Sequence, residues 1–268
     1  MRILVTGAAG FLGSNLVPIL EGHEVTEAER FGFHPDRSPG YVPAGVLHST
    51  PDPLCDLPDE IDAAIQLYAL PGVASCEAQP DVAHSMNVSN LLHLLRFMDG
   101  RRVVFPSSAA VERLDSFYGA TKAAGEIYCR HFPNVAILRI TNVFGPHSWH
   151  KSSVVASFCR AFVHGQHPRI KDGAVERDFV WVGDVCERIV ELVEIPKLIP
   201  DAPYTVSPFK RTTIRDVATR LSFISSGSQL HGDYFDARLM ETYQWFVNEK
   251  ARRDAAADAA NLAGEIVA

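Results

Sequence analysis

Tyr118 and Lys122 have the side-chain types and the spacing that proton transfer requires. The stretch 118–131 predicts a helix, and residues four apart lie one turn above each other on the same helix face. A free tyrosine titrates near pH 10, so its phenolate must be favoured by roughly 4 kcal/mol to act as a base near neutral pH. One positive charge at about 4 Å supplies roughly that amount at an effective dielectric constant of about 20. We therefore expect Lys122 to lower the pKa of the Tyr118 phenol, although such a pair taken alone is more often part of a solvated helix surface.

Ser108 is the third candidate for chemistry. It follows the stretch 102–105, which predicts a strand, and stands with Ser107 at the carboxyl end of that strand. A serine hydroxyl in this place can hydrogen-bond the substrate oxygen whose proton Tyr118 removes. The order of the three residues therefore predicts Ser108, Tyr118 and Lys122 as a catalytic set.

A glycine-rich turn at the start of the chain predicts a site for phosphates. The apolar run 3–5 predicts a strand, Gly7 ends it, and Phe11, Leu12 and Leu16 then follow at helical spacing. In a dinucleotide-binding turn the glycines allow unusual backbone angles, close approach of the diphosphate and tight packing of helix on strand. Gly7, Gly10 and Gly13 are spaced G-x-x-G-x-x-G rather than G-x-G-x-x-G, so a plain glycine-rich turn between strand and helix is the alternative.

Glu29 lies 22 residues beyond Gly7, at the end of a predicted second strand over 24–30. A nucleotide-binding unit places an acidic residue there to bind the adenosine ribose. Arg30 follows directly, and an arginine would attract the 2′-phosphate that the acid repels. We expect NAD as the cofactor, with NADP as the alternative if Arg30 controls the pocket. A solvated carboxylate at a strand end is the simpler interpretation of Glu29.

The composition excludes some partners. The 268 residues carry 25 basic and 32 acidic side chains, a formal net charge of −7, so neither a nucleic-acid backbone nor an anionic membrane is expected as a general partner. No apolar run approaches the roughly 18 residues of a membrane span, and the N-terminus shows no signal peptide. We expect a cytoplasmic protein.

Metal chemistry is not expected. The five cysteines (Cys55, Cys76, Cys129, Cys159 and Cys186) are scattered without C-x-x-C spacing, and predict reduced thiols. His147 with His150, and His164 with His167, have i,i+3 spacing but no nearby acid or cysteine that would complete a site.

The predicted elements alternate between strand and helix. Further strands are expected at 61–69 and 102–105 and helices at 81–98, 118–131, 213–223 and from about 237, whereas 31–60 predicts a loop with at most a short strand at 41–47. This alternation predicts an α/β fold, a doubly wound parallel sheet of the Rossmann type, whose ligands bind beyond the carboxyl ends of the strands. Pro18 should kink the first helix, and Arg101 with Arg102 predicts a solvated strand end.

Two regions are expected. Residues 1–146 with about 174–200 would form the dinucleotide-binding domain. About 147–173 and 201–268 would form a small, abbreviated C-terminal substrate-binding region.

Several motifs together resemble the extended short-chain dehydrogenase/reductases of the NAD-dependent epimerase/dehydratase family, over about residues 1–225. The sequence V-T-G-A-A-G-F-L-G-S is similar to the family's glycine fingerprint, and S-S-A-A-V with Y-G-A-T-K is similar to its catalytic segments. The stretches L-R-I-T-N-V-F-G-P at 138–146 and R-D-F-V-W-V-G-D-V at 177–185 resemble two later signatures.

The resemblance implies roles for further residues. Asp56 and Leu57 match the adenine-contacting pair, Asn87 would lie near the cofactor, and Asn142 and Arg177 would face the diphosphate of a nucleotide sugar, although for Arg177 a structural ion pair is nearly as plausible. The implied cofactor contacts are Gly7, Gly10, Phe11, Leu12, Gly13, Glu29, Arg30, Asp56, Leu57, Leu67, Tyr68, Ala69, Asn87, Ser107, Tyr118, Lys122 and Thr141. The implied substrate contacts are Ser108, Asn142 and Arg177.

The chain departs from the family pattern in several places. Only nine residues separate Ser108 from Tyr118, so part of the lid facing the substrate is missing, and the C-terminal region is also short. Gln66 and Tyr68 stand where a histidine and a small residue are common. Ala109 and Ala110 replace the Asp-Glu pair of the 4,6-dehydratases and cannot move protons, which disfavours dehydration.

The sequence thus predicts an NAD(P)-dependent epimerase or oxidoreductase of a nucleotide-activated sugar, with Tyr118 as base. An NADPH-dependent ketoreductase of a keto-sugar or other small substrate is the alternative within the same class. A cofactor-binding sensor or scaffold without turnover is the alternative from another class. Family likeness also implies a homodimer formed by the helices from Asp81 and Tyr118.

Overall fold

The chain divides into two compact units, residues 1–141 with 183–206 and residues 142–182 with 207–268. The computed structural model describes residues 1–28, 60–199, 202–207, 211–228 and 232–267, with side chains described as far as residue 257. The short strand predicted at 41–47 lies outside the described residues.

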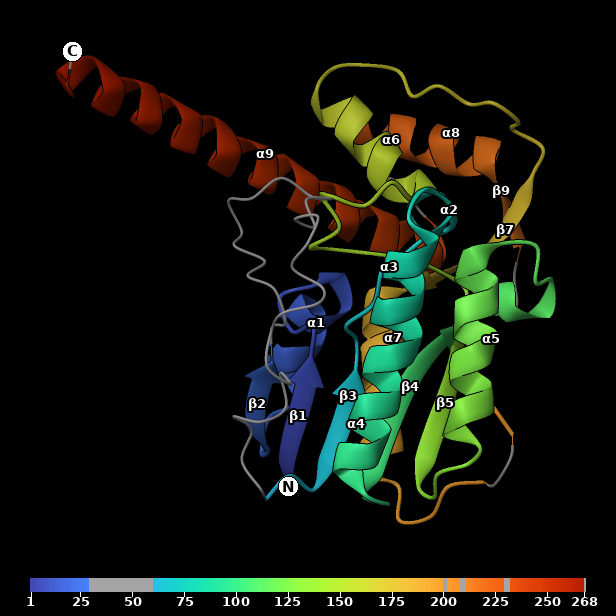
Figure 1. Ribbon diagram of the computed structural model, residues 1–268. Coiled ribbons are helices and arrows are strands. Elements are labelled where there is room, and N and C mark those ends of the chain that lie inside the picture. Colours follow the sequence, from blue (N-terminus) through green and yellow to red (C-terminus); the bar gives the residue numbers. More distant parts are fainter. Residues whose placement is uncertain (29–59, 200–201, 208–210, 229–231, 268) are drawn as a thin grey trace. The chain divides into compact units, whose positions relative to one another are not determined.

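A six-stranded parallel sheet forms the centre of the first unit (Figure 1). Its order is β2-β1-β3-β4-β5-β8, so the chain reverses direction across the sheet between β1 and β3, where doubly wound folds bind ligands. The strands are β1 (Arg2–Thr6), β2 (Glu24–Ala28), β3 (Ala63–Gln66), β4 (Arg102–Ser108), β5 (Val135–Ile140) and β8 (Tyr204–Val206). The predicted Rossmann-type sheet is confirmed.

Helices connect successive strands of this sheet. In Figure 1, α4 and α5 lie in front of it and α7 behind it. The helical elements are α1 (Phe11–Leu16), η1 (Val17–Ile19), α2 (Val73–Ala78), α3 (Pro80–His84), η3 (Ser85–Ser89), α4 (Asn90–Met98), η4 (Ala109–Glu112), α5 (Phe117–Cys129) and α7 (Val182–Glu194). Pro18 lies in the 3₁₀ turn η1 after α1 has ended at Leu16, where its missing N–H removes no α-helical hydrogen bond.

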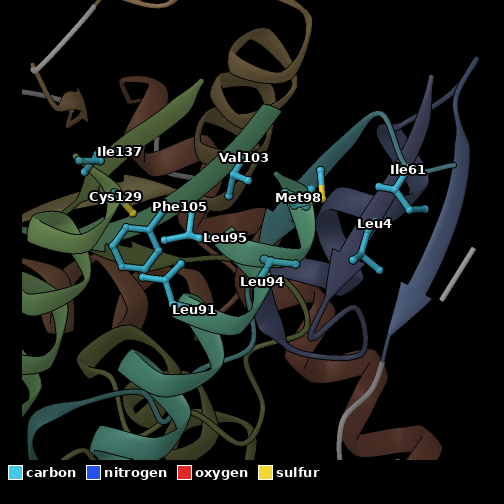
Figure 2. Close-up of a cluster of buried hydrophobic side chains, with 11 residues drawn as sticks. Leu4, Ile61, Leu91, Leu94, Leu95, Met98, Val103, Phe105, Cys129 and Ile137 are labelled. Atoms are coloured by element: carbon cyan, nitrogen blue, oxygen red, sulfur yellow. The ribbon is translucent and has the colours of Figure 1, made fainter. Parts of the chain in front are cut away.

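An apolar cluster of this unit lies between α4 and the sheet. Leu91, Leu94, Leu95 and Met98 follow the i, i+3, i+4, i+7 pattern of one helix face. Figure 2 shows them packed with the strand residues Leu4, Val103 and Phe105 and with Ile61, Cys129 and Ile137. This core fixes the strand β4 that carries Ser108.

The sequence predicts that Arg101 and Arg102 form a solvated strand end, and this prediction is wrong, because both side chains bind backbone carbonyls. Arg101 donates to the carbonyls of Met98 and Ile61, both at 2.8 Å. Arg102 Nη1 donates to the carbonyls of Leu192 (2.7 Å) and Ile195 (3.0 Å). The two guanidinium groups therefore satisfy carbonyls at the C-terminal ends of α4 and α7, where helix carbonyls lack partners and a positive charge is favoured.

The second unit has its own three-stranded sheet. β6 (Asn142–Phe144) runs parallel to β7 (Glu176–Trp181), which pairs antiparallel with β9 (Arg211–Thr213). The helices are α6 (Val154–Val163), α8 (Ile214–Ser225) and α9 (Tyr234–Val267). Phe144 packs edge-on against Trp181 and Phe235, with ring centroids 5.8 and 5.3 Å apart.

The unit boundaries differ from the predicted regions at three points. The second unit begins at residue 142 rather than 147, and it includes β7, which had been assigned to the dinucleotide-binding domain. β8, by contrast, had been assigned to the substrate-binding region, but it pairs with β5 at the edge of the main sheet.

Candidate active site

The glycine turn lies at the carboxyl end of β1. Gly7 has φ of +72°, and a Cβ atom there would lie 2.8 Å from the Tyr68 nitrogen. At Gly13 a Cβ atom would lie 2.1 Å from the Ala8 carbonyl oxygen. Both positions therefore require glycine, the first for its backbone angle and for space, the second because α1, with Phe11 and Leu12 in its first turn, packs directly on the turn.

The segment after β3 lies against this turn. The Leu67 amide donates to the Thr6 carbonyl (3.1 Å) and the Tyr68 amide to the Thr6 hydroxyl (3.3 Å). Gln66 accepts from the same hydroxyl (2.9 Å) and donates to the Tyr68 carbonyl (3.1 Å). Gln66 thus holds the predicted cofactor-contacting backbone of 67–69 beside the glycine turn.

Asn87 lies in the π-helical turn η3 and is buried. Its amide oxygen accepts from the Leu70 N–H (2.7 Å), and its amide nitrogen donates to the Leu70 carbonyl (3.2 Å) and to Thr121 Oγ1 (3.0 Å). The described contacts of this side chain join the loop after β3 to helix α5. A contact with the cofactor stays a prediction.

Helix α5 presents Tyr118 from its first turn. Ser116 caps the helix by accepting from the Gly119 amide (3.1 Å). Ser108, at the end of β4, accepts from the Ala110 amide (3.2 Å) and lies close enough to the Tyr118 phenol to lower its pKa. The structure therefore brings the predicted Ser108 and Tyr118 together.

Lys122 is buried behind this pair, with 6% of its surface exposed. Its ammonium donates to the Pro106 carbonyl (2.8 Å) and lies 4.9 Å from the centroid of the Phe105 ring. Burial lowers the pKa of the Lys122 ammonium to about 8.

The pKa of Tyr118 shifts in the direction opposite to the one predicted. Burial raises the pKa of the phenol, and the Ser108 hydrogen bond only partly opposes this effect. Lys122, whose ammonium donates to the Pro106 carbonyl, is not among the groups that shift this pKa. Desolvation of the phenolate therefore outweighs the contribution of Ser108.

Ser107 directs its hydroxyl away from the predicted cofactor site. The hydroxyl donates to Glu126 Oε1 (2.7 Å), and Arg139 forms two bonds to the same carboxylate, Nε to Oε1 (2.8 Å) and Nη2 to Oε2 (2.7 Å). Burial alone would raise the pKa of Glu126, but hydrogen bonds from Arg139 and Ser107 hold it below its ordinary value. The sequence analysis missed this network. Its signals were an acid one turn beyond Lys122 and an arginine inside an apolar strand.

Thr141 follows β5, next to the end of β4. Its hydroxyl is buried, and no hydrogen-bond partner lies within the described part of the chain. A buried polar atom in this state indicates a missing partner. Together with the glycine turn, in which side chains larger than hydrogen do not fit at Gly7 and Gly13, it fits the dinucleotide predicted from the sequence.

Asn142 and Arg177 lie in the second unit, on the neighbouring strands β6 and β7. Asn142 donates to the Asp178 carbonyl (3.1 Å), and Arg177 donates to the carbonyl of Glu176 (3.0 Å). Both side chains are exposed. Their predicted contact with a diphosphate stays a prediction.

Four predicted cofactor residues, Glu29, Arg30, Asp56 and Leu57, lie outside the described residues. Within the described ranges no group of three or more His, Cys, Asp or Glu side chains could hold a metal ion. Among the helices of the same ranges, none combines the length and the apolar character needed to cross a bilayer.

The family model described as the NAD dependent epimerase/dehydratase family matches residues 3–204. The ADP-L-glycero-D-manno-heptose-6-epimerase of Nitratidesulfovibrio vulgaris is 25% identical over 287 residues, covering 86% of either chain. The UDP-glucose 4-epimerase of Mycolicibacterium smegmatis is 30% identical over 229 residues, covering 71% of this chain and 72% of the relative.

A solved structure shares the fold. The Bordetella bronchiseptica enzyme WbmF, in complex with NAD+ and UDP, superimposes with a TM-score of 0.77 at 21% identity, over 98% of this chain and 97% of that chain.

Proposed function

The chain belongs to the NAD dependent epimerase/dehydratase family, and from this premise we propose that it is an NAD-dependent epimerase or oxidoreductase of a nucleotide-activated sugar. The observation that carries the proposal is the interaction of Ser108, at the carboxyl end of β4, with the Tyr118 phenol, whose pKa it lowers. It joins two groups able to exchange a proton with a sugar hydroxyl, in the unit that also contains the glycine turn.

Gly7, Gly10, Gly13 and the 67–69 backbone would hold NAD. When bound, NAD supplies the hydride acceptor and donor. Tyr118 removes the hydroxyl proton of the sugar carbinol, and Ser108 hydrogen-bonds the same oxygen as its charge develops. If the ketone regains its hydride on the opposite face, return of the proton by Tyr118 completes an epimerisation, whereas an oxidoreductase would release the oxidised or reduced sugar.

Because the pKa of Tyr118 is raised, binding of the cofactor and substrate must lower it before the phenol can act as a base. A phenol whose pKa lies above its ordinary value is a weak base at neutral pH, so a positive charge must approach it before turnover. Lys122 is a candidate, because it lies one turn along α5. Transfer of its hydrogen bond from Pro106 to the cofactor or to Tyr118 would bring this charge to the phenol.

The cofactor experiment separates the two main functions. Protein purified without added nucleotide is mildly denatured, and the released cofactor is identified by mass spectrometry. Retained NAD(H), with conversion of a nucleotide sugar into its epimer, supports the epimerase. An empty site that fills with NADPH, together with net reduction of a keto-sugar, would support the ketoreductase alternative.

The proposed class of substrate, a nucleotide sugar, depends on Asn142 and Arg177 as residues that bind its diphosphate. Because they lie on adjacent strands with exposed side chains, a nucleoside diphosphate should protect the NAD-loaded protein against heat. A ligand at about one hundred times its dissociation constant adds roughly 2.7 kcal/mol, and Arg177→Ala should abolish most of the protection. Protection by a simple hydroxy compound, with none by the nucleotide, would overturn the sugar-nucleotide assignment.

A homodimer is part of the proposal. Phe117, Ile127 and Tyr128 on α5 expose 49%, 54% and 39% of their surfaces, and such apolar side chains on one helix favour burial against another chain. Ile127→Arg should convert a dimer to a monomer in sedimentation experiments. A monomeric wild type would refute this assignment.

A further inference from the structure

The Ser108 hydroxyl lies between the Ala110 amide and the Tyr118 phenol. The Ala110 amide donates to its oxygen at 3.2 Å, and Ser108 lowers the pKa of the phenol. A serine hydroxyl has one proton and two lone pairs. Because the Ala110 amide occupies one lone pair, it orients the hydroxyl and leaves its proton for Tyr118.

The position of Ala110 depends in turn on Gly119. A Cβ atom at Gly119 would lie 2.8 Å from the Ala110 carbonyl oxygen and 3.3 Å from Ser116 Oγ. Gly119 lies inside helix α5 and has no positive φ, so its backbone angles do not require glycine. Glycine is less favourable than alanine in a helix, so another feature must explain it in the first turn of α5. The close approach of α5 to Ala110 accounts for its presence here.

We propose that Gly119 is a positioning residue, which sets the Ser108 hydroxyl relative to Tyr118 by allowing the first turn of α5 to contact the Ala110 carbonyl. The role in turnover rests on the proposed function. The contact itself does not.

The first experiment compares Gly119→Ala with Gly125→Ala. Gly125 lies on the same helix, and a Cβ atom there would lie 2.6 Å from Cζ of Phe105 in the core, so this variant is also overpacked, but against core side chains rather than against Ala110. We expect Gly119→Ala to speed amide hydrogen exchange of Ala110 by about tenfold or more, as Ser108→Ala should also do. Gly125→Ala should lower the free energy of unfolding. It should speed the exchange of the Ala110 amide by no more than that loss of stability accounts for.

The second experiment measures turnover in a double-mutant cycle. Gly119→Ala should lower kcat about tenfold or more, with KM and the NAD dissociation constant changed less than about threefold. In a Ser108→Ala background the same substitution should have an effect of less than about twofold, because residues that act through one group are not additive. An undiminished tenfold effect in that background would show that Gly119 does not act through Ser108.

Ala110→Pro provides an independent variant if Gly119→Ala does not fold. Proline removes the amide that donates to Ser108 and is tolerated in the first turn of a helix, and it leaves α5 unchanged. It should reduce kcat as Gly119→Ala does, and a kcat equal to the wild type would overturn the proposal.

If the wild type turns over no nucleotide sugar, the proposed function fails. The contact is then tested by the hydrogen exchange of the Ala110 amide alone. The exchange is measured in Gly119→Ala and in the double variant Gly119→Ala/Ser116→Ala, which removes the second close contact. An exchange rate equal to that of the wild type would show that Gly119 does not position Ala110.

Discussion

Glu126 of helix α5 and Arg139 of strand β5 form a forked ion pair, with the arginine Nε and Nη2 at 2.8 and 2.7 Å from separate carboxylate oxygens. The carboxylate is 4% exposed and also accepts from Ser107. One buried group therefore connects β4, β5 and α5, the three elements that carry or flank Ser108, Tyr118 and Lys122.

Glu126→Gln should lower the free energy of unfolding by about 3 kcal/mol at neutral pH, because it leaves the Arg139 guanidinium without its buried partner. Glu112 is the matched control, since it lies 3.7 Å from the same arginine but is 66% exposed, and Glu112→Gln should cost less than about 1 kcal/mol. Urea denaturation measures both. Equal losses would show that the fork contributes no more than a surface pair.

The same pair sets a pH dependence. The pKa of Glu126 is held below its ordinary value of 4.5, so its contribution is complete above that pH and is lost as the pH falls through the folded-state value. The difference in unfolding free energy between wild type and Glu126→Gln should therefore shrink only under acidic conditions.

Lys122 should show the opposite dependence. Its pKa is about 8 in the folded protein against 10.5 for a free lysine, so unfolding takes up a proton between these values and stability rises with pH across that window. The cost of burying the ammonium is complete below about pH 8. Relative to Lys122→Met, the wild type should gain up to about 3 kcal/mol between pH 8 and 10.5. A pH-independent difference would mean that Lys122 titrates normally.

Tyr118→Phe should lower turnover by orders of magnitude and leave NAD binding nearly intact, because only the proton acceptor is lost. Lys122→Ala should harm both, and the double mutant should lose little more rate than the worse single variant. Retention of more than about a tenth of the activity by Tyr118→Phe, a change of about 1.4 kcal/mol in the barrier, would exclude Tyr118 as the base.

Gly10 separates cofactor binding from folding. A Cβ atom there would lie 3.1 Å from the Gly7 carbonyl oxygen, whereas at Gly22, with φ of +84°, no atom lies within 4 Å of it. Gly10→Ala should weaken NAD binding at least tenfold, about 1.4 kcal/mol, at little cost in stability. Gly22→Ala should cost about 1 kcal/mol of stability with the NAD affinity unchanged. Calorimetric titration measures the NAD affinity of both variants. Equal affinities would show that the glycine turn at Gly10 does not bind the cofactor.

Glu29 predicts that NAD(H) binds at least tenfold tighter than NADP(H), about 1.4 kcal/mol. Fluorescence quenching by each cofactor measures the ratio. Equal affinities, or a preference for NADPH, would show that Arg30 controls the pocket.

Alternation of strands and helices was sufficient to predict the main sheet, because buried parallel strands such as β1 and β4 contain continuous apolar runs, 3–5 and 103–105. It also predicted that Ser108 shares an edge with the glycine turn, since the carboxyl ends of parallel strands lie on one side. It did not place β7, because Phe179, Val180 and Trp181 are equally apolar in either sheet.

The side-chain partners were harder to predict. The ammonium of Lys122 binds the Pro106 backbone carbonyl, and Arg102 binds carbonyls about 90 positions away. Backbone carbonyls leave no signature in residue types, so neither contact follows from spacing. The raised pKa of Tyr118 depends on how closely the chain surrounds the phenol, which only the folded structure shows.

The π-helical turn η3 divides one continuous helical path into two phases. Each residue advances an α-helix by about 100°, so the wider turn at Ser85–Ser89 rotates α4 relative to α3. This rotation lets Asn87 reach Leu70 while Leu91 and Leu95 face the sheet. Deletion of one residue within the turn would restore a regular helix, but it would turn either the amide or the leucines out of place. The contact of Asn87 with Leu70 and the packing of Leu91 and Leu95 on the sheet thus depend on the same extra residue in η3. A change in the helix phase that keeps one of them would lose the other.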